Sequence, residues 1–154
     1  MSKIQDRLEQ LGILLDEPPS PVAAYVPAVT FLDKLVYVSG QDCRKNGKLI
    51  YEGLLGRDLT VQQGYECARQ SAINCLAVLK QHIGDLEKVK RVVKVLGFVA
   101  SAPGFEEQPY VINGGSELFE TVFGENGKHA RSAIGTNQLP FGTPVEIEVI
   151  FELK

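Results

Sequence analysis

One long apolar stripe constrains the fold of this chain more than any other feature. Small and apolar residues recur at spacings of three or four over residues 61–83, which places them on one face of a helix of about six turns. Thr60 and Gln63 have the spacing of a capping box, and Gly84 can end the helix. The small residues in its middle would let it lie close to a sheet. The stripe consists of Val61, Tyr65, Ala68, Ala72, Cys75, Leu79 and Ile83.

A β-hairpin is predicted near the N-terminal end. Residues 24–31 and 34–41 read as its two strands, with Leu32 and Asp33 at the turn. Pro27 has no backbone N–H, so we expect its strand at a sheet edge or at a bulge. Gly40, directly after Ser39, suggests a bulge or a close backbone approach. Residues 42–58 predict a loop with one short strand at 48–51.

Three more strands are predicted towards the C-terminus. The β-branched run 88–100 is apolar on both faces in its second half, as a central strand would be. Strict alternation places Val95 on one face of it and Val92 on the other. Residues 129–137 and 144–153 predict two further strands, and the last of these alternates between apolar residues and a largely polar set.

Two further helices are expected. Residues 2–11 begin with a Ser2–Gln5 capping-box pattern, carry Ile4, Leu8 and Leu11 on one face, and end at Gly12. The second runs from Pro109 to about Phe123. Its interior contains Gly114 and Gly115, which cost on the order of 2 kcal/mol relative to alanine. This cost requires a reason, either close packing or a ligand.

The order of these elements predicts an α+β fold. We expect a mixed sheet with two helices packed on one face and a short N-terminal helix in addition, formed by residues 1–154 as a single domain. A hydrophobic fraction of 44% and a charged fraction of 23% are ordinary for a globular chain and argue against disorder.

Charge and cysteine content disfavour several classes of partner. The formal net charge is −3 and no extended basic segment is present, which disfavours nucleic acid as a partner. Cys43, Cys67 and Cys75 form no C-x-x-C pair and have no histidine at ligand spacing, so we expect reduced thiols and no metal. The N-terminus lacks the apolar core of a signal peptide, and no apolar run is long enough for a membrane helix. We therefore expect a cytoplasmic protein.

The common catalytic motifs are absent, so the chain predicts no cofactor. Two charged residues stand out instead. Arg131 begins an otherwise small and apolar strand, and it is either a solvated or salt-bridged arginine or a bidentate clamp for a carboxylate. Glu146 follows after a turn that could return it beside Arg131 in an antiparallel pair, although a solvent-facing strand glutamate is the simpler interpretation.

Several segments resemble the RidA/YjgF family. The C-terminal signature is carried by an arginine followed by small residues, a Leu-Pro turn and a Val-Glu-Ile-Glu strand. The family's Ser-Gly-Gln strand end and asparagine-bearing helix have counterparts too. The matches span residues 23–153. The matching segments are His129-Ala130-Arg131-Ser132-Ala133, Leu139-Pro140, Val145-Glu146-Ile147-Glu148, Val36-Tyr37-Val38-Ser39-Gly40-Gln41, and Asn113 before Phe119 and Phe123.

The resemblance implies a chorismate-mutase-like fold of the bacillus type, a homotrimer with ligand clefts between subunits, and hydrolysis of reactive enamines and imines to a keto acid and ammonia. By the same resemblance, Arg131 would bind the substrate carboxylate and Glu146 would position the attacking water. The cleft would be lined by Tyr25, Ser39, Asn113 and the backbone around Ala133.

The sequence also departs from the deaminase members of that family. Tyr25 follows Ala24 instead of the usual proline, His129 replaces a common proline, and Ala133 replaces a frequent cysteine. These departures indicate a less characterised branch with an open substrate. His129 is either a surface residue or an acid/base group of this branch. A non-catalytic carboxylate-binding module and an endoribonuclease or translation inhibitor are the alternative functions.

Overall fold

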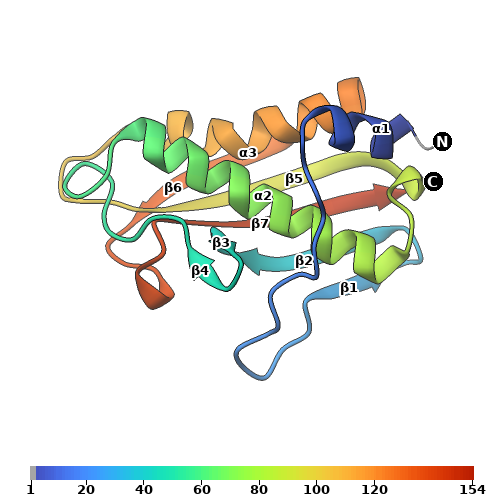
Figure 1. The fold of residues 1–154 in the computed structure, drawn as a ribbon, viewed down its shortest axis with the longest axis horizontal. Coiled ribbons are helices and arrows are strands. Elements are labelled where there is room, and N and C mark those ends of the chain that lie inside the picture. Colours follow the sequence, from blue (N-terminus) through green and yellow to red (C-terminus); the bar gives the residue numbers. More distant parts are fainter. Residues whose placement is uncertain (1–2) are drawn as a thin grey trace.

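The computed structural model describes residues 3–154 and contains a five-stranded mixed sheet in the order β1-β2-β7-β5-β6 (Figure 1). The β5–β6 pair is parallel and the other pairs are antiparallel. The strands of this sheet are β1 Ala28–Phe31, β2 Leu35–Gln41, β5 Val89–Ala100, β6 Ala130–Thr136 and β7 Val145–Leu153, and a separate hairpin joins β3 Arg44–Lys45 to β4 Lys48–Leu49. The helices are α1 Lys3–Gln10, α2 Val61–Ile83 and α3 Gln108–Phe123, and short 3₁₀ turns lie at Leu86–Lys88, Gly124–Gly127 and Pro140–Gly142.

The long helix is confirmed as α2, and it packs on one face of the sheet beside α3 (Figure 1). Thr60 accepts a hydrogen bond from the Gln63 backbone, and the Gln63 side chain accepts one from the Thr60 backbone N–H at 2.9 Å. The middle of the predicted stripe is fully buried against the sheet, while Val61 and Ile83 at its ends are partly exposed. The apolar stripe therefore decides which face of α2 is covered.

The paired glycines of α3 are explained by close packing. A Cβ at Gly114 would lie 2.0 Å from the backbone oxygen of Tyr65 in α2. A Cβ at Gly115 would lie 2.8 Å from the Ile147 side chain and 3.3 Å from the Ala68 carbonyl oxygen. The unfavourable helix propensity of the two glycines is thus the cost of bringing α3 into contact with both α2 and the sheet.

The first hairpin is shorter than predicted. Residues 24–27 are not part of the strand, which begins at Ala28, directly after Pro27. Since Pro27 cannot donate to a neighbouring strand, the ladder starts where backbone donors become available. Leu32 and Asp33 both have positive φ, 53° and 55°, as a tight two-residue turn requires. β1 lies at the edge of the sheet, and pairing of β2 with β7 is irregular between Val38 and Gln41, as expected for a bulge at Gly40.

β5 does not alternate as strictly as predicted. Val92 was expected on the face opposite Val95, yet both side chains are buried, with exposed fractions of 1% and 0%. The pairing of β5 with β7 shifts between Val92 and Lys94. Because an extra residue in one strand reverses the facing of the side chains that follow, this irregularity brings Val92 to the same core.

α1 packs with its apolar face inward, against α3 and the turn after α2. Ile4 and Leu8 are buried as predicted, whereas Leu11 lies beyond the helix and is 36% exposed. Gly12 has a positive φ of 67° at the end of the helix, in agreement with the prediction. Ser2, predicted as a cap, lies outside the described residues.

Candidate functional site

Arg131 is held by neutral hydrogen-bond acceptors. Its Nη1 donates to Asn113 Oδ1 at 2.8 Å and to Ser116 Oγ at 3.1 Å, and its Nη2 donates to the Pro109 carbonyl oxygen at 3.4 Å. All three acceptors belong to α3, which lies against the face of β6 that carries Arg131. Among residues 3–154, no carboxylate forms an ion pair with this guanidinium. Its charge is therefore fixed in place without being neutralised.

His129 lies two residues before Arg131 and is half-buried, so it is not the fully solvated surface histidine that was one of the two interpretations. Its Nδ1 is 2.6 Å from the Gly127 carbonyl oxygen, and its Nε2 is 2.9 Å from Ser116 Oγ. Burial lowers the pKa of His129, and the nearby Arg131 cation lowers it further, while the Gly127 carbonyl opposes this. The imidazole is thus favoured in its neutral form.

Glu146 lies in a separate cleft of about 400 Å³, together with Tyr25 and Ser39. Burial raises the pKa of Glu146, and the charges of Asp42 and Glu148 raise it further. A Cβ at Gly40 would lie 2.7 Å from Glu146 Oε2, so glycine lets the carboxyl group lie directly against the backbone of β2. A carboxyl group with a raised pKa suits proton transfer near neutral pH.

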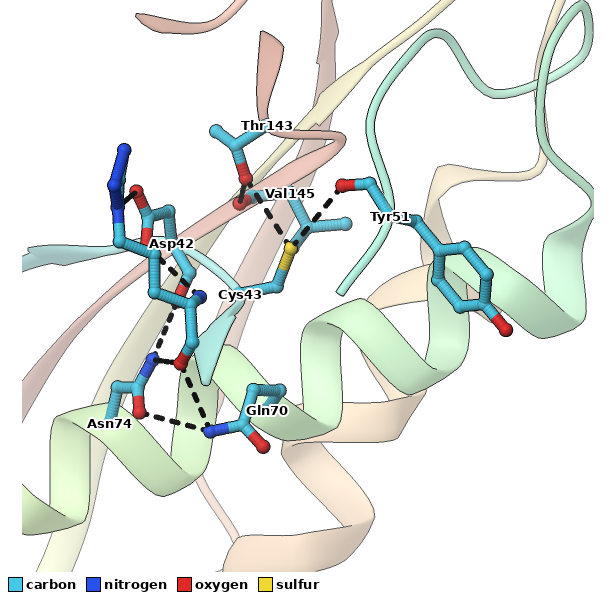
Figure 2. Close-up of polar contacts among 8 residues, drawn as sticks. Asp42, Cys43, Tyr51, Gln70, Asn74, Thr143 and Val145 are labelled. Atoms are coloured by element: carbon cyan, nitrogen blue, oxygen red, sulfur yellow. Dashed lines mark hydrogen bonds and ion pairs between the residues drawn. The ribbon is translucent and has the colours of Figure 1, made fainter. Parts of the chain in front are cut away.

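The wall of this cleft is tied to α2 (Figure 2). Asn74 Nδ2 donates to the carbonyl oxygens of Asp42 and Arg44, both at 2.9 Å, and Gln70 Nε2 donates to the second of these at 3.3 Å. Between them Cys43 points inward, with its Sγ 3.7 Å from Thr143 Oγ1. Since these contacts fix the backbone from Asp42 to Arg44, the side chains of both residues project into the cleft from a rigid base.

Asp42 and Arg44 were not recognised in the sequence as residues of this cleft. The Arg44 guanidinium pairs with Asp42 at 3.0 Å and lies over the Phe141 ring, 5.1 Å from its centroid. Phe141 itself has a positive φ of 61° in the turn before β7. The sequence contains no signal for this group, because loops far apart in the chain bring its members together. Ser116, in contrast, could have been found from its spacing of three after Asn113 in the same helix.

The structure does not place Glu146 beside Arg131 within one chain. The two strands that carry them were expected to pair, but β5 lies between β6 and β7. Arg131 is in register with Val95 and faces the helices, whereas Glu146 is in register with Phe98 and faces the open side of the sheet. One chain therefore presents two groups of predicted residues, with Arg131, Asn113 and Ala133 in one and Tyr25, Ser39 and Glu146 in the other.

The comparisons with known proteins identify the family. A family model described as YjgF/chorismate mutase-like, with endoribonuclease as a suggested activity, matches residues 5–152. Protein TCP17 from Trypanosoma cruzi is 43% identical over 153 residues, which cover 99% of this chain and 95% of that protein. The chain belongs to the YjgF/chorismate mutase-like family.

Two solved structures of high similarity agree with this assignment. Protein Atu1372 from Agrobacterium tumefaciens, of unknown function, is 47% identical with a TM-score of 0.88 and alignment over 99% of this chain and 93% of its own. An endoribonuclease candidate from Shewanella oneidensis is 30% identical with a TM-score of 0.94, over 99% and 100% of the two chains. The fold is thus the chorismate-mutase-like fold of the YjgF family, as the C-terminal signature predicted.

Neither group of site residues contains an evident metal site. Among residues 3–154, no cluster of three or more histidine, cysteine or acidic side chains is arranged to hold an ion. Within the same range, no helix has the length and apolar character that crossing a bilayer requires. The chemistry available to the two groups is that of a fixed guanidinium and a half-buried carboxyl group.

Proposed function

We propose that this protein hydrolyses reactive 2-imino and enamine acids to a keto acid and ammonia. The observation that carries the proposal is the Arg131 guanidinium, which is fixed by Asn113 and Ser116 and lacks a carboxylate partner among the described residues. Among residues 3–154, the hydrogen bonds of Arg131 use both Nη1–H groups and one Nη2–H, which leaves its Nε–H and second Nη2–H without a partner there. A planar guanidinium with two free donors suits a carboxylate ligand.

Glu146 supplies the acid/base group of the proposed reaction. A water molecule attacks the carbon of the C=N bond while Glu146 accepts one of its protons. Glu146 then returns this proton to nitrogen, which gives a carbinolamine. In the second half of the reaction Glu146 takes the proton of the new hydroxyl group and passes it to nitrogen, so that the C=O bond forms, the C–N bond breaks and ammonia leaves. The imine carbon is already electrophilic, so orientation and a single acid/base group are sufficient. The raised pKa of Glu146 supports this role.

A homotrimer with clefts between subunits is part of the proposal. Since Arg131 and Glu146 face opposite sides of the sheet, a complete site requires Arg131 from one copy and Glu146 from another. The open face of the sheet, which we define as Val29, Phe31, Tyr37, Leu96 and Ile150, supports such an assembly. Its side chains at the β1–β2 edge are 45–54% exposed, which is unusual for an apolar group of this kind.

The test measures the release of ammonia and keto acid when the protein is added to an amino-acid oxidase that generates 2-imino acids. We expect the wild-type protein to accelerate the release of ammonia and keto acid, and we expect Arg131→Ala to lose most of this acceleration. Arg57→Ala is the matched control, because this guanidinium pairs with the adjacent Asp58 on the surface. Equal rates with and without the wild-type protein, for imino acids with several different side chains, would contradict the hydrolase.

A non-catalytic module that binds a small carboxylate is the second candidate, because the contacts of Arg131 require only a ligand. Glu146→Gln separates the two. A hydrolase loses turnover in this variant while its affinity for pyruvate, used as a keto-acid probe, changes little. Turnover that persists in Glu146→Gln would count against the mechanism given above. Pyruvate binding without any turnover by the wild type would favour the binding module.

The names of some relatives suggest endoribonuclease activity, which the net charge of −3 disfavours for this chain. RNA binding that weakens steeply with salt would revive the endoribonuclease activity as a candidate.

A cytoplasmic location is also proposed, supported by free, buried cysteines at positions 43, 67 and 75 that suit a reducing compartment.

A further inference from the structure

A chain of hydrogen bonds leads from the backbone of the α3–β6 connection to Arg131. The Gly127 carbonyl oxygen contacts His129 Nδ1 at 2.6 Å, His129 Nε2 contacts Ser116 Oγ at 2.9 Å, and Ser116 Oγ contacts Arg131 Nη1 at 3.1 Å. Neither His129 nor Ser116 belongs to the residues that the family resemblance assigns to ligand binding. The geometry gives both a role in the placement of the guanidinium.

The direction of each hydrogen bond follows from the chemistry of the groups. A carbonyl oxygen only accepts, so His129 Nδ1 carries the proton. In the neutral imidazole Nε2 is then an acceptor, and the Ser116 hydroxyl donates to it. A guanidinium only donates, so Ser116 Oγ accepts from Arg131. His129 and Ser116 are each used once as a donor and once as an acceptor, and the Gly127 carbonyl fixes the direction of all three hydrogen bonds.

Packing holds the hydrogen-bonded side chains of Ser116 and His129 in place. Ser116 lies on the buried face of α3 with an exposed fraction of 7%. The Phe119 ring meets the His129 ring edge to face, with centroids 6.1 Å apart and an interplanar angle of 88°. Because the imidazole is clamped between Phe119, Gly127 and Ser116, it presents Nε2 to Ser116 in one orientation. The lone pair of Ser116 that faces Arg131 is therefore fixed as well.

We propose that His129 and Ser116 are positioning residues for Arg131, holding its guanidinium so that Nε–H and one Nη2–H point to the carboxylate of a ligand. The identity of that ligand rests on the function proposed above, whereas the positioning of the guanidinium does not. His129 acts through Ser116 and touches neither the ligand nor the reacting atoms. It is the orientation of the ring that matters, with Nδ1 on the Gly127 carbonyl and Nε2 on Ser116.

The first test measures the free protein by NMR. We expect His129 in the tautomer with the proton on Nδ1, and separate, slowly exchanging Nη signals from Arg131. Ser116→Ala removes the acceptor, and His129→Asn can reach the Gly127 carbonyl but not Ser116; both are expected to merge the Arg131 signals. His129→Gln, whose amide oxygen can accept from Ser116, is expected to retain separate signals. His82→Gln is the matched control, because this histidine contacts Thr30 at the far edge of the sheet.

The second test measures the dissociation constant of pyruvate. Ser116→Ala and His129→Asn are expected to weaken binding about fivefold to tenfold, as the loss of one hydrogen bond of ordinary strength predicts. The double variant should be no weaker than either single variant, because both remove the same contact. His129→Gln should stay within about twofold of the wild type. A purely structural role would lower Tm without this pattern of rescue and non-additivity.

The two tests separate failure of this inference from failure of the proposed function. Arg131 signals unchanged in Ser116→Ala and His129→Asn would overturn the positioning role, whether or not pyruvate binds. So would merged signals with unchanged pyruvate affinity. If wild-type protein binds no pyruvate, the ligand class is wrong, and the Arg131 signals alone decide the positioning role.

Discussion

Arg131 and Glu146 carry opposite charges, and the fold treats the two charges differently. Arg131 donates to neutral acceptors on α3, which hold the guanidinium in place without neutralising its charge. Glu146 is half-buried near two other carboxylates, and burial first and these charges second raise the pKa of Glu146. The sequence drew attention to both residues by their types and positions, and the family resemblance implied their roles. The sequence could not identify the hydrogen bonds of His129, since these depend on the packing of α3 against the segment that enters β6.

Glu146→Gln is expected to stabilise the protein at alkaline pH. The pKa of Glu146 is raised in the folded state, so its stabilising contribution is present below its ordinary pKa of 4.5 and is lost as pH rises through the folded value. At pH 8 we expect Tm to increase by a few degrees, since about 1 kcal/mol corresponds to about 2–4 °C in a protein of this size. The measurement is thermal unfolding at pH 8 and pH 4. A gain of equal size at both values would contradict the assignment.

Arg131→Gln is expected to raise the pKa of His129, because it removes the neighbouring cation that lowers it. The pKa of His129 is lowered in the folded state, so its contribution to stability is present above pH 6.5 and is lost as pH falls through the folded value. The stability of the Arg131→Gln variant should therefore decrease less as the pH falls through this range. An NMR titration of the His129 ring checks the shift, and His82 in the same spectrum is the internal control. An unchanged titration midpoint would be the contradictory result.

At the scale of elements, α3 depends on glycines that its own helix propensity disfavours. Gly114 contacts the Tyr65 carbonyl oxygen of α2, and Gly97 of β5 leaves room for Ile112, which a Cβ there would meet at 2.5 Å. In α3, Asn113 directly precedes Gly114, and Ser116 directly follows Gly115. The close approach of α3 therefore also sets how near the acceptors of Arg131 lie to β6.

Gly114→Ala is expected to destabilise the protein by roughly 1–3 kcal/mol, the range of overpacked cores, despite the better helix propensity of alanine. Its methyl group would collide with backbone atoms of α2, which cannot rotate away. Gly64→Ala is the comparison, since its Cβ would meet only side-chain atoms of Leu55 and Val111 and these can adjust. Urea unfolding measures both. A smaller loss in Gly114→Ala than in Gly64→Ala would refute the close-packing account.

At the scale of the whole molecule, the helices cover one face of the sheet and leave the other open (Figure 1). Arg131 lies on the side of the sheet that the helices cover, and Glu146 lies on the open side. The N-terminal connection after α1 crosses α2 (Figure 1). Its residues Pro19 and Tyr25 line the cleft of Glu146. A site that uses both charged residues thus requires more than one copy of the chain.

Tyr37→Lys is expected to weaken the proposed trimer, because it places a charge in the middle of the open face, in register with Val29 and Ile150. Sedimentation velocity at micromolar concentration should show a shift from trimer towards monomer, together with a loss of turnover. Leu14→Lys is the control, since Leu14 is 77% exposed on the N-terminal connection. A wild-type protein that sediments as a monomer would remove the shared cleft from the model.

The sequence by itself determined the local elements of this protein: the capped α2 helix, the turn at Leu32 and Asp33, and the alternation of β7. These features depend on residues within a few positions of one another, so a pattern of spacing specifies them. The tertiary structure decided where the strands lie relative to one another, and with it the separation of Arg131 from Glu146. It also decided the shift in β5 that buries Val92 and the contact of His129 with Ser116. The reason is physical: strand order and helix packing minimise the free energy of contacts between distant segments, and no local pattern records them.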